Sequence, residues 1–340
     1  MRISKGLNNK GTVLIFALWV LGFLAVIALN ISYGIKGKIG LAKRLQNHSQ
    51  VSLSLAGAVK MAAVFIAQET ARSNEYNVLR KVNLHNNPAV FGGIELGDYR
   101  AEVSYIERGS ESQKRRYGVV DEESKININA TTAVVLGNLI EETLHIAPER
   151  ADRLARDILN WRNYGESDIT GFYSNEYYNN LEFPYPKKST DYELIDELLL
   201  VKGVDSKVFD QLRRFLTVWG QGKVNINTAP FEVLVALGFS EDLVNKILAA
   251  RRGKDGVEGT LDDHIFLKTY DVASEVNSIS KLTPQEMLSI DEKNAQGVFT
   301  VDAQFFTIEA SAFAPHADMP KAVRAVFSAR ENKIIYWNEK

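Results

Sequence analysis

Residues 12–31 read TVLIFALWVLGFLAVIALNI and carry no charged side chain. Only Gly22 and Asn30 interrupt the apolar run. Because an α-helix rises about 1.5 Å per residue, these 20 residues span about 30 Å as a helix, the thickness of the hydrocarbon core of a bilayer. The basic residues Arg2, Lys5 and Lys10 precede the run. The stretch therefore predicts a membrane-spanning helix close to the N-terminus.

Three kinds of N-terminal segment fit such a run. A secretory signal peptide has an apolar region of about 7–15 residues and a small-x-small cleavage site, whereas this run is longer and is followed by SYGIK at residues 32–36. A plain membrane anchor needs no further signal. A type IV pilin-like leader is a short basic peptide that ends in glycine and is removed in front of the apolar helix. The pair Lys10-Gly11 directly before Thr12 fits this third pattern.

The charges around the run leave its orientation open. Lys36, Lys38, Lys43 and Arg44 follow the run, so basic residues lie on both of its sides. The positive-inside rule therefore does not decide the orientation. We expect the short N-terminal side to be cytoplasmic, because the other side carries the folded remainder of the chain.

The composition argues against several classes of protein. The chain has 340 residues and a formal net charge of -2, so it has no global basic field that would attract nucleic acid. It has no cysteine, which excludes disulfides and thiolate metal sites. Its five histidines lie far apart, and no phosphate loop, dinucleotide fingerprint or Gly-x-Ser-x-Gly motif occurs. These observations favour a protein that is not an enzyme.

A helical pattern continues beyond the apolar run. Leu55, Val59, Ala62 and Ile66 are spaced by four, three and four residues, which predicts one apolar stripe that packs on a domain. Glycines at 34, 37 and 40 each cost about 0.8–1 kcal/mol relative to alanine in a helix and weaken the segment between the two parts. The pattern fits a single spine helix over residues 12–77. It fits equally an anchor helix followed by a separate first helix of the domain.

The rest of the chain alternates strands with a helical block. Residues 94–106 and 117–120 form a predicted hairpin, and residues 298–312 and 322–329 are predicted strands. Between them a repeat occurs, because KININA at 125–130 returns as KVNINT at 223–228. Two predicted helices follow each copy. We expect the asparagines to hydrogen-bond the backbone at a strand-to-helix corner.

This order predicts an α+β protein in which a large α-helical domain is inserted into a sheet domain. The predicted divisions are a leader over residues 1–11, the transmembrane and spine helix over 12–77, and a helical insertion over 130–295. The α/β domain combines residues 78–129 with 296–340. The long N-terminal helix is expected to pack on an antiparallel sheet.

Three features together resemble the minor pseudopilin K family of type II secretion systems, also called general secretion pathway protein K. They are the leader KG-TVLIFALWVL, the two K-[IV]-N-I-N corners, and the stretch ELLLVKGV at residues 197–204. The loop that contains Glu176, Tyr177, Tyr178 and Pro184-Tyr185 is also similar to that family. The resemblance covers nearly the whole chain and implies a pilin-like α/β domain.

The resemblance also implies a function. Prepilin peptidase is expected to cut after Gly11, and the new terminus at Thr12 is expected to be methylated. Ordinary pilins carry glutamate at the fifth mature position, where this chain has Phe16. A subunit without that carboxylate suits the tip of a pseudopilus, with minor pseudopilins I and J and the major pseudopilin as partners. The implied location is the bacterial inner membrane, crossed once, with the globular domain in the periplasm, where the protein supports export across the outer membrane.

One acidic loop is a candidate calcium site. Asp255, Glu258, Asp262 and Asp263 fall within nine residues beside two glycines, and hard oxygen ligands on such a loop suit calcium. The spacing is not that of an EF-hand, and a solvated acidic loop is the plainer interpretation. Members of the resembled family include calcium binders with a similar loop. Glu166 and Asp168 form a weaker second candidate.

Two other functions, DNA binding and hydrolysis, fit the sequence less well. The repeated corners also resemble helix-hairpin-helix modules, so a membrane-anchored DNA-binding protein is the alternative function. Both hairpins, at Gly203 and Gly238, lack a second glycine, and Asp205 would repel phosphate, so no nucleic acid partner is expected. A hydrolase built on the adjacent residues 262–264 lacks a site geometry, because neighbours in sequence do not readily converge.

Overall fold

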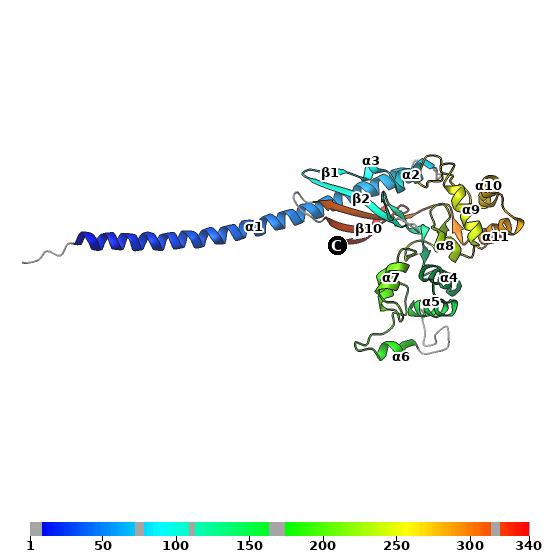
Figure 1. The fold of residues 1–340 in the computed structure, drawn as a ribbon, viewed down its shortest axis with the longest axis horizontal. Helices are drawn as coiled ribbons and strands as arrows, with labels where there is room; N and C mark the ends of the chain where they lie inside the picture. The colour runs from blue at the N-terminus through cyan, green and yellow to red at the C-terminus, as the bar shows by residue number, and fades with distance from the viewer. Residues whose placement is uncertain (1–8, 72–77, 109–112, 163–173, 314–319, 340) are drawn as a thin grey trace, which may run out of the picture.

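The computed structural model describes residues 9–71, 78–108, 113–162, 174–313 and 320–339. One long helix, α1 (Asn9–Ala71), leads into a head that combines an antiparallel sheet with a block of helices (Figure 1). The first half of α1 projects away from the head, and its second half lies along the sheet (Figure 1). The predicted α+β class, with a long helix on an antiparallel sheet, is confirmed.

The second half of α1 buries one apolar stripe. Leu55, Val59, Ala62 and Ile66 have no exposed surface, and Val51 at the start of the stripe is 4% exposed. The stripe lies against strands β2 (Tyr99–Arg108), β9 (Phe305–Phe313) and β10 (Lys321–Ser328). Side chains three and four residues apart share one face of a helix, so burial of this face fixes α1 on the sheet. The predicted stripe is confirmed.

The glycines at 34, 37 and 40 do not interrupt the helix. Helix α1 contains 63 residues without a break, which corresponds to a length of about 95 Å at about 1.5 Å per residue. The continuous spine is therefore observed, and the alternative of two separate helices is wrong for the described chain. The predicted end of the spine at residues 72–77 lies outside the described residues.

The sheet has seven antiparallel strands. Its main path runs β1-β2-β9-β10-β11, with β3 paired to β2 and β4 paired to β9. The remaining strands are β1 (Ile94–Leu96), β3 (Gln113–Tyr117), β4 (Val120–Asp121) and β11 (Lys333–Glu339). Strands from both ends of the chain meet where Val103 of β2 faces Ala310 of β9. Alternate residues of these strands, such as Ala101 and Val103, are buried beneath α1.

The chain between β4 and β9 forms the helical block, whose second half with α9–α11 lies at the end of the head remote from the projecting half of α1, while its first half with α4–α7 extends to one side (Figure 1). Each half of the block begins with a short strand and ends with its parallel partner. In the first half β5 (Ile126–Asn127) pairs with β6 (Leu216–Thr217), and in the second half β7 (Val224–Asn225) pairs with β8 (Phe299–Thr300). Its main helices are α4 (Ala133–Leu144), α5 (Pro148–Arg162), α7 (Ser206–Leu212), α8 (Phe231–Ala236), α9 (Glu241–Arg251), α10 (Val272–Ile279) and α11 (Pro284–Ala295).

Shorter elements complete the fold. They are α2 (Val78–His85), α3 (Pro88–Phe91), α6 (Ser174–Asn179), and the 3-10 helices η1 (Glu122–Ser124), η2 (Ile195–Leu200) and η3 (Thr269–Asp271). Helices α2 and α3 lead from α1 into the sheet, while η1 leads from β4 into the helical block.

The head contains two hydrophobic cores. One core joins the stripe of α1 to the inward face of the sheet. The other lies within the helical block and includes Ile128, Leu139 and Ile158 from its first half and Ile226 and Ile247 from its second. Along the chain, the buried residues pass from one core to the other between Val119 and Ile126, and back between Val301 and Ala303. The domain boundaries at 129/130 and 295/296 stay a prediction.

The stripe on α1 predicts unequal effects for two leucines that are two residues apart and therefore lie on opposite faces of the helix. Leu55→Ala removes a fully buried side chain, so we expect it to lower the free energy of unfolding by about 2–5 kcal/mol. Leu53 is 64% exposed, and Leu53→Ala is the matched control with an expected change within about 0.5 kcal/mol. Urea unfolding of both variants measures the difference. Equal losses would contradict the packing of α1 on the sheet.

Candidate assembly site and acidic junction

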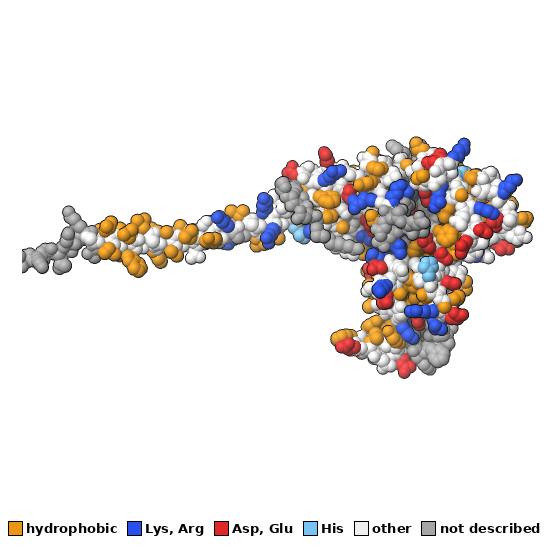
Figure 2. Space-filling view, in the orientation of Figure 1, with side chains coloured by type: hydrophobic (Ala, Val, Ile, Leu, Met, Phe, Trp, Pro, Cys, Tyr) orange, Lys and Arg blue, Asp and Glu red, His pale blue; other side chains and the backbone are white. Residues whose placement is uncertain are grey.

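The projecting half of α1 is apolar and uncovered. Its large apolar side chains from Val13 to Leu45 are all exposed, with Phe16 at 71% and Trp19 at 76% (Figure 2). The helix is long and apolar enough to cross a membrane, with a mean hydropathy of 2.6 over its most apolar window and none of that window buried. An apolar surface of this extent requires an apolar environment outside the protein. The helix is therefore the candidate site for membrane anchoring and assembly.

The predicted processing residues lie at the free end of this helix. Gly11, Thr12 and Phe16 fall within the first turns of α1, far from the head (Figure 1). A Cβ atom at Gly11 would meet no atom within 4 Å. Phe16 is an apolar residue in an apolar segment, and the first acidic residue of α1 is Glu69. The structure thus shows an accessible segment without a carboxylate, and its processing stays a prediction.

The paired asparagine corners of the sequence form matching turns. The side-chain oxygen of Asn127 accepts a hydrogen bond from the backbone N–H of Asn129 at 2.8 Å. In the second copy, Asn225 accepts from the backbone N–H of Asn227 at 3.0 Å. In each copy, the side chain of the first asparagine therefore accepts the N–H two residues later, a role that a backbone carbonyl has in an ordinary turn.

The second asparagine of each pair binds a distant segment. Asn129 donates to the carbonyl of Tyr192 and accepts from its N–H, each at 2.9 Å. Asn227 makes the same two bonds with Phe266, also at 2.9 Å each. A side-chain amide can replace a backbone partner in this way because it carries both a donor and an acceptor. The predicted structural role of these asparagines is observed.

An arginine completes each corner. Arg162, the last residue of α5, donates to the carbonyl of Thr131 at 3.1 Å, and Arg251, the last residue of α9, donates to the carbonyl of Ala229 at 2.5 Å. Thr131 and Ala229 occupy equivalent positions in the two copies, since 229 − 131 = 98 and 223 − 125 = 98. The repeated sequence therefore builds a repeated hydrogen-bonded unit.

Three consecutive buried acids, which we call the acidic junction, lie between the sheet and the helical block. They are Asp121, Glu122 and Glu123, with 1%, 1% and 7% exposure. No motif in the sequence marks these three residues as a site. Their signal was the run DEES directly before the first corner, which composition alone does not distinguish from a solvated acidic turn.

Glu122 is the centre of the junction. Its carboxylate accepts hydrogen bonds from Lys125 at 2.5 Å, from the hydroxyl of Thr217 at 2.6 Å and from the hydroxyl of Thr307 at 2.6 Å. Thr217 belongs to β6 of the helical block, and Thr307 belongs to β9 of the sheet. One carboxylate therefore joins the two parts of the head.

The other two acids reach the remaining neighbours. Asp121 accepts from the side chains of Asn225 at 2.8 Å and Thr228 at 2.5 Å, which ties it to the second corner. Glu123 accepts from the backbone N–H groups of Gln304 at 3.3 Å and Phe305 at 3.1 Å, at the start of β9. The acidic junction thus contacts Lys125 of the first corner, Asn225 and Thr228 of the second corner, and the start of β9.

Burial gives the three carboxyl groups different protonation behaviour. Burial, followed by the charge of Asp121, raises the pKa of Glu123 to about 9, and burial also raises the pKa of Asp121. Burial acts on Glu122 in the same direction, but the positive charges of Lys125 and Arg324 outweigh it, and the pKa of Glu122 is lowered. Glu122 is therefore the charged member and Glu123 the protonated member near neutral pH.

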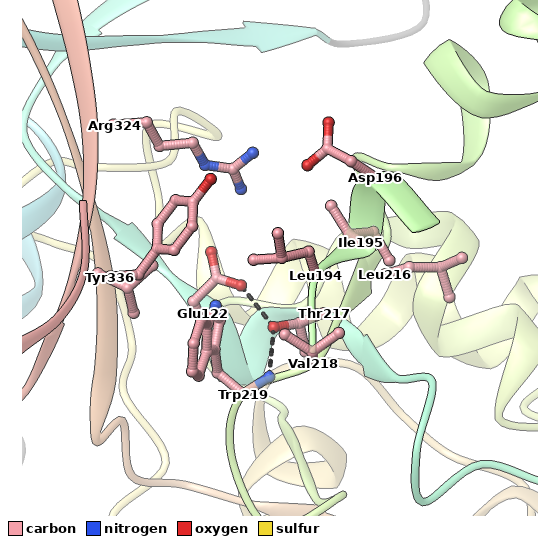
Figure 3. A pocket seen from close by; sticks show the side chains of 11 residues that line it. Glu122, Leu194, Ile195, Asp196, Leu216, Thr217, Val218, Trp219, Arg324 and Tyr336 are labelled. Atoms are coloured by element: carbon pink, nitrogen blue, oxygen red, sulfur yellow. Dashed lines mark hydrogen bonds between the residues drawn. The ribbon is translucent and has the colours of Figure 1, made fainter. Parts of the chain in front are cut away.

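A small pocket opens beside Glu122. Arg324 of β10 and Tyr336 of β11 form its sheet side, while Ile195 and Asp196 of η2 form its helical side (Figure 3). The Arg324 guanidinium and the Asp196 carboxylate point toward one another across its mouth (Figure 3). The pocket marks the seam between sheet and helical block.

The acidic loop of the sequence is folded by its own hydrogen bonds. Asp262 accepts from the backbone N–H groups of Lys254 at 2.8 Å and Asp255 at 3.0 Å, and Asp263 accepts from Gly259 at 2.9 Å. A hydrogen bond from the Thr260 side chain and the N–H of Asp255 lower the pKa of Asp262 to about 2. The loop is therefore a compact turn of paired groups.

The loop is also tied to its surroundings. Glu258 forms an ion pair with the buried Arg251, and its carbonyl accepts from Arg116 of β3 at 3.1 Å. Gly253 has φ +64, and a Cβ atom there would come within 2.2 Å of the Asp262 carbonyl oxygen, so only glycine fits. The loop thus joins α9 to the sheet.

The predicted calcium ligands share this loop but face protein donors. Asp255 accepts from the N–H of Val257 at 2.7 Å, so all four of Asp255, Glu258, Asp262 and Asp263 have protein partners. Within the described ranges, no three His, Asp or Glu side chains are gathered as a metal site. Calcium binding by these four residues stays a prediction. Glu166 and Asp168 lie outside the described residues.

The buried proton on Glu123 predicts a dependence of stability on pH. Its folded pKa of about 9 lies above the ordinary value of 4.5, so its contribution is complete below about pH 4.5 and is lost as the pH rises to about 9. Glu123→Gln removes this titration and keeps an acceptor for the N–H groups of Gln304 and Phe305. We expect the slope of unfolding free energy between about pH 6 and 9 to flatten by up to about 1.4 kcal/mol per pH unit.

Urea unfolding at several pH values measures this slope. The control is Glu95→Gln, which changes an exposed glutamate of β1 and should leave the slope as it is. A slope that stays the same in Glu123→Gln would contradict a protonated Glu123 in the folded head.

Comparison with known proteins identifies relatives. Residues 118–221 match the family model described as type II secretion system (T2SS), protein K. A chain of the GspK-GspI-GspJ complex from the type 2 secretion system of enterotoxigenic Escherichia coli shares the fold, with a TM-score of 0.65 and 13% identity over 88% of this chain and 99% of that chain. No curated protein matches the chain by sequence.

The family match is local, whereas the likeness of fold is global. The matched residues contain the acidic junction, the first corner, α4, α5 and α7, and the shared fold extends over most of the chain. Residues 118–221 therefore resemble protein K of type II secretion systems, and the overall fold is similar to that of a chain of the GspK-GspI-GspJ complex.

Proposed function

We propose that this protein is a non-catalytic minor pseudopilin at the tip of the pseudopilus, where it supports protein export across the outer membrane. The observation that carries the proposal is the uncovered apolar α1, which has Phe16 and no early carboxylate, joined to a head that resembles protein K. In an apolar environment a carboxylate is costly unless a neighbour's charge pairs with it. A subunit that lacks this carboxylate suits the last position of a filament.

The helical block supports a position at the tip. Its second half, with α9–α11, lies at the end of the head opposite the projecting half of α1, and its first half extends to one side (Figure 1). In a filament built by parallel packing of α1 helices, this block would occupy the space above the subunit. Stacking of a further head there would be obstructed.

The partners follow from the relative of similar fold. That relative is a complex of GspK with GspI and GspJ. We extend this to minor pseudopilins I and J as partners of the present chain, together with the major pseudopilin and prepilin peptidase. No nucleic acid partner is proposed.

The location follows from the same helix. The exposed apolar span supports a single crossing of the bacterial inner membrane. The short leader before it lies in the cytoplasm in this proposal, and the head lies in the periplasm. Prepilin peptidase then acts between Gly11 and Thr12, at the accessible end of α1.

The two corner units are proposed to be helix-hairpin-helix-like repeats that serve packing. Gly203 and Gly238 adopt φ +83 and +91 at the two hairpins, as tight turns require. At the first hairpin the carboxylate of Asp205 accepts from the N–H of Val208 at 2.8 Å. This acid occupies the helix N-terminus at which a phosphate would bind, which disfavours the alternative of DNA binding.

Calcium binding by the loop of Asp255, Glu258, Asp262 and Asp263 stays a prediction. The carboxylates of Asp262 and Asp263 accept hydrogen bonds from backbone N–H groups and keep further lone pairs that could bind the ion. The low pKa of Asp262 keeps this carboxylate ionised.

The calcium prediction is tested by thermal unfolding in excess chelator and in excess calcium. If the loop binds calcium, the folded protein gains about 2.7 kcal/mol when free calcium is a hundredfold above the dissociation constant. Asp262→Asn should abolish this gain, whereas Asp302→Asn, at an exposed acid of the same head, should retain it. Unfolding temperatures that do not respond to calcium in the unaltered chain would remove the prediction.

The proposed processing is tested by intact mass and N-terminal sequence. We expect a methylated N-terminus at Thr12 in membranes that contain prepilin peptidase and an uncut Met1 in membranes that lack it. Gly11→Val should block cleavage completely, because the residue before the cut is changed. Gly22→Val, at a glycine within the same helix, is the matched control and should be cut normally.

Cleavage beyond residue 31 would instead indicate a signal peptide and overturn the proposal. An uncut chain in both membranes would leave an ordinary anchored protein. DNA binding that weakens steeply with salt would then support the alternative function.

A further inference from the structure

A largely exposed segment of α1 lies between the apolar run and the head, which reaches it where the Tyr99 hydroxyl donates to the Asn47 side chain at 3.4 Å. Residues 32–50 separate Ile31 from Val51, the first buried residue of the stripe. Ile35, Ile39 and Leu45 in this segment are 50%, 61% and 61% exposed. Apolar side chains of this size in water imply a covering surface that is not part of the described chain.

The segment is amphipathic. At about 100° per residue, Ile35, Ile39, Ala42 and Leu45 fall within about 120° of the helix circumference. Lys38 and Gln46 are the polar members of this arc, and the long stem of a lysine can lie along an apolar face while its charge reaches water. The segment therefore presents one apolar face over about three turns.

The opposite face is basic. Lys36, Lys43 and Arg44 fall within about 100° of arc, centred roughly 150° from the apolar face. All three are exposed, and no acidic residue precedes Glu69 in α1. Together with Lys38 we call them the basic collar, which is visible between the apolar half of α1 and the head (Figure 2).

An apolar face flanked by basic residues is the pattern of a helix in the plane of an anionic membrane surface. The collar begins five residues after the membrane span ends at Ile31, so the headgroups are its nearest neighbour. Glycines at 34, 37 and 40 supply a place to bend, because each lowers the helical population by about fivefold relative to alanine. A Cβ atom at Gly40 would meet no atom within 4 Å, so no packing requires glycine there.

We propose that residues 33–48 dock on anionic phospholipid headgroups, with the apolar face inward and the basic collar on lipid phosphates. The proposal rests on the membrane anchoring in the proposed function. In the free chain the segment continues α1 without a break. On a membrane it bends at the glycines, and the head then lies close to the bilayer until assembly lifts it.

The absence of cysteine makes a unique fluorescent label available. The full chain carrying Ile39→Cys is labelled with nitrobenzoxadiazole and reconstituted in vesicles of phosphatidylcholine alone or mixed with an equal amount of phosphatidylglycerol. In the mixed vesicles, we expect the fluorescence emission of the label to be that of a lipid environment. In the neutral vesicles, we expect the emission of a label in water. High salt should return the emission to that of water.

Charge variants test the collar itself. Each basic side chain near an anionic surface favours the docked state by about fivefold, so replacing Lys36, Lys43 and Arg44 with Gln should lower the docking constant about a hundredfold. The matched control replaces three exposed lysines of the head with Gln, Lys114, Lys207 and Lys281, which removes the same charge and should leave docking unchanged.

Two reference labels separate failure of this inference from failure of the anchor. A label at Leu24→Cys should report lipid in both kinds of vesicle, and a label at Lys207→Cys should report water in both. Water-like emission at position 24 would overturn the anchor and the docking together. Water-like emission at position 39 in both vesicles, or shielding only after assembly with other pseudopilins, would overturn the docking alone.

Discussion

A buried carboxylate cannot be left without partners, and this constraint governs the head. Glu122 is ionised and 1% exposed, and it is stabilised by Lys125 of its own turn, Thr217 of β6 and Thr307 of β9. Removing one partner of a buried ion pair typically costs about 3–5 kcal/mol. The sheet and the helical block are therefore fixed relative to each other by a polar contact with defined geometry, in addition to apolar packing.

This rigid head contrasts with the helix that carries it. From Val51 onward, α1 is held by a continuous apolar stripe, whereas the large apolar side chains from Val13 to Leu45 are exposed. The division assigns different roles to the two halves of one helix. The covered half positions the head, and the exposed half carries the membrane contact and assembly of the proposed function. In the repeated corners, the side-chain amides of Asn129 and Asn227 hydrogen-bond the backbone of distant segments. These bonds hold long loops in place without disulfides.

The features predicted well from the sequence share a local origin. The stripe of Leu55, Val59, Ala62 and Ile66 follows from helical period, and the asparagine corners follow from a repeat with turn chemistry. The acidic loop stays a predicted calcium site. Its four carboxylates share one loop. Which donors they face depends on the loop conformation, and that conformation requires the positive φ of +64 at Gly253.

The sequence by itself determined the anchor helix, the α+β order and the duplicated corner, because composition and period are properties of neighbouring residues. Only the tertiary structure decided which acidic residues are buried and join the sheet to the helical block. Asp121, Glu122 and Glu123 resemble a solvated turn in sequence, and the loop acids at 255–263 resemble a site. The difference arises from partners 95 and 185 residues away from Glu122, at Thr217 and Thr307, because burial of a charge is defined by the contacts that enclose it.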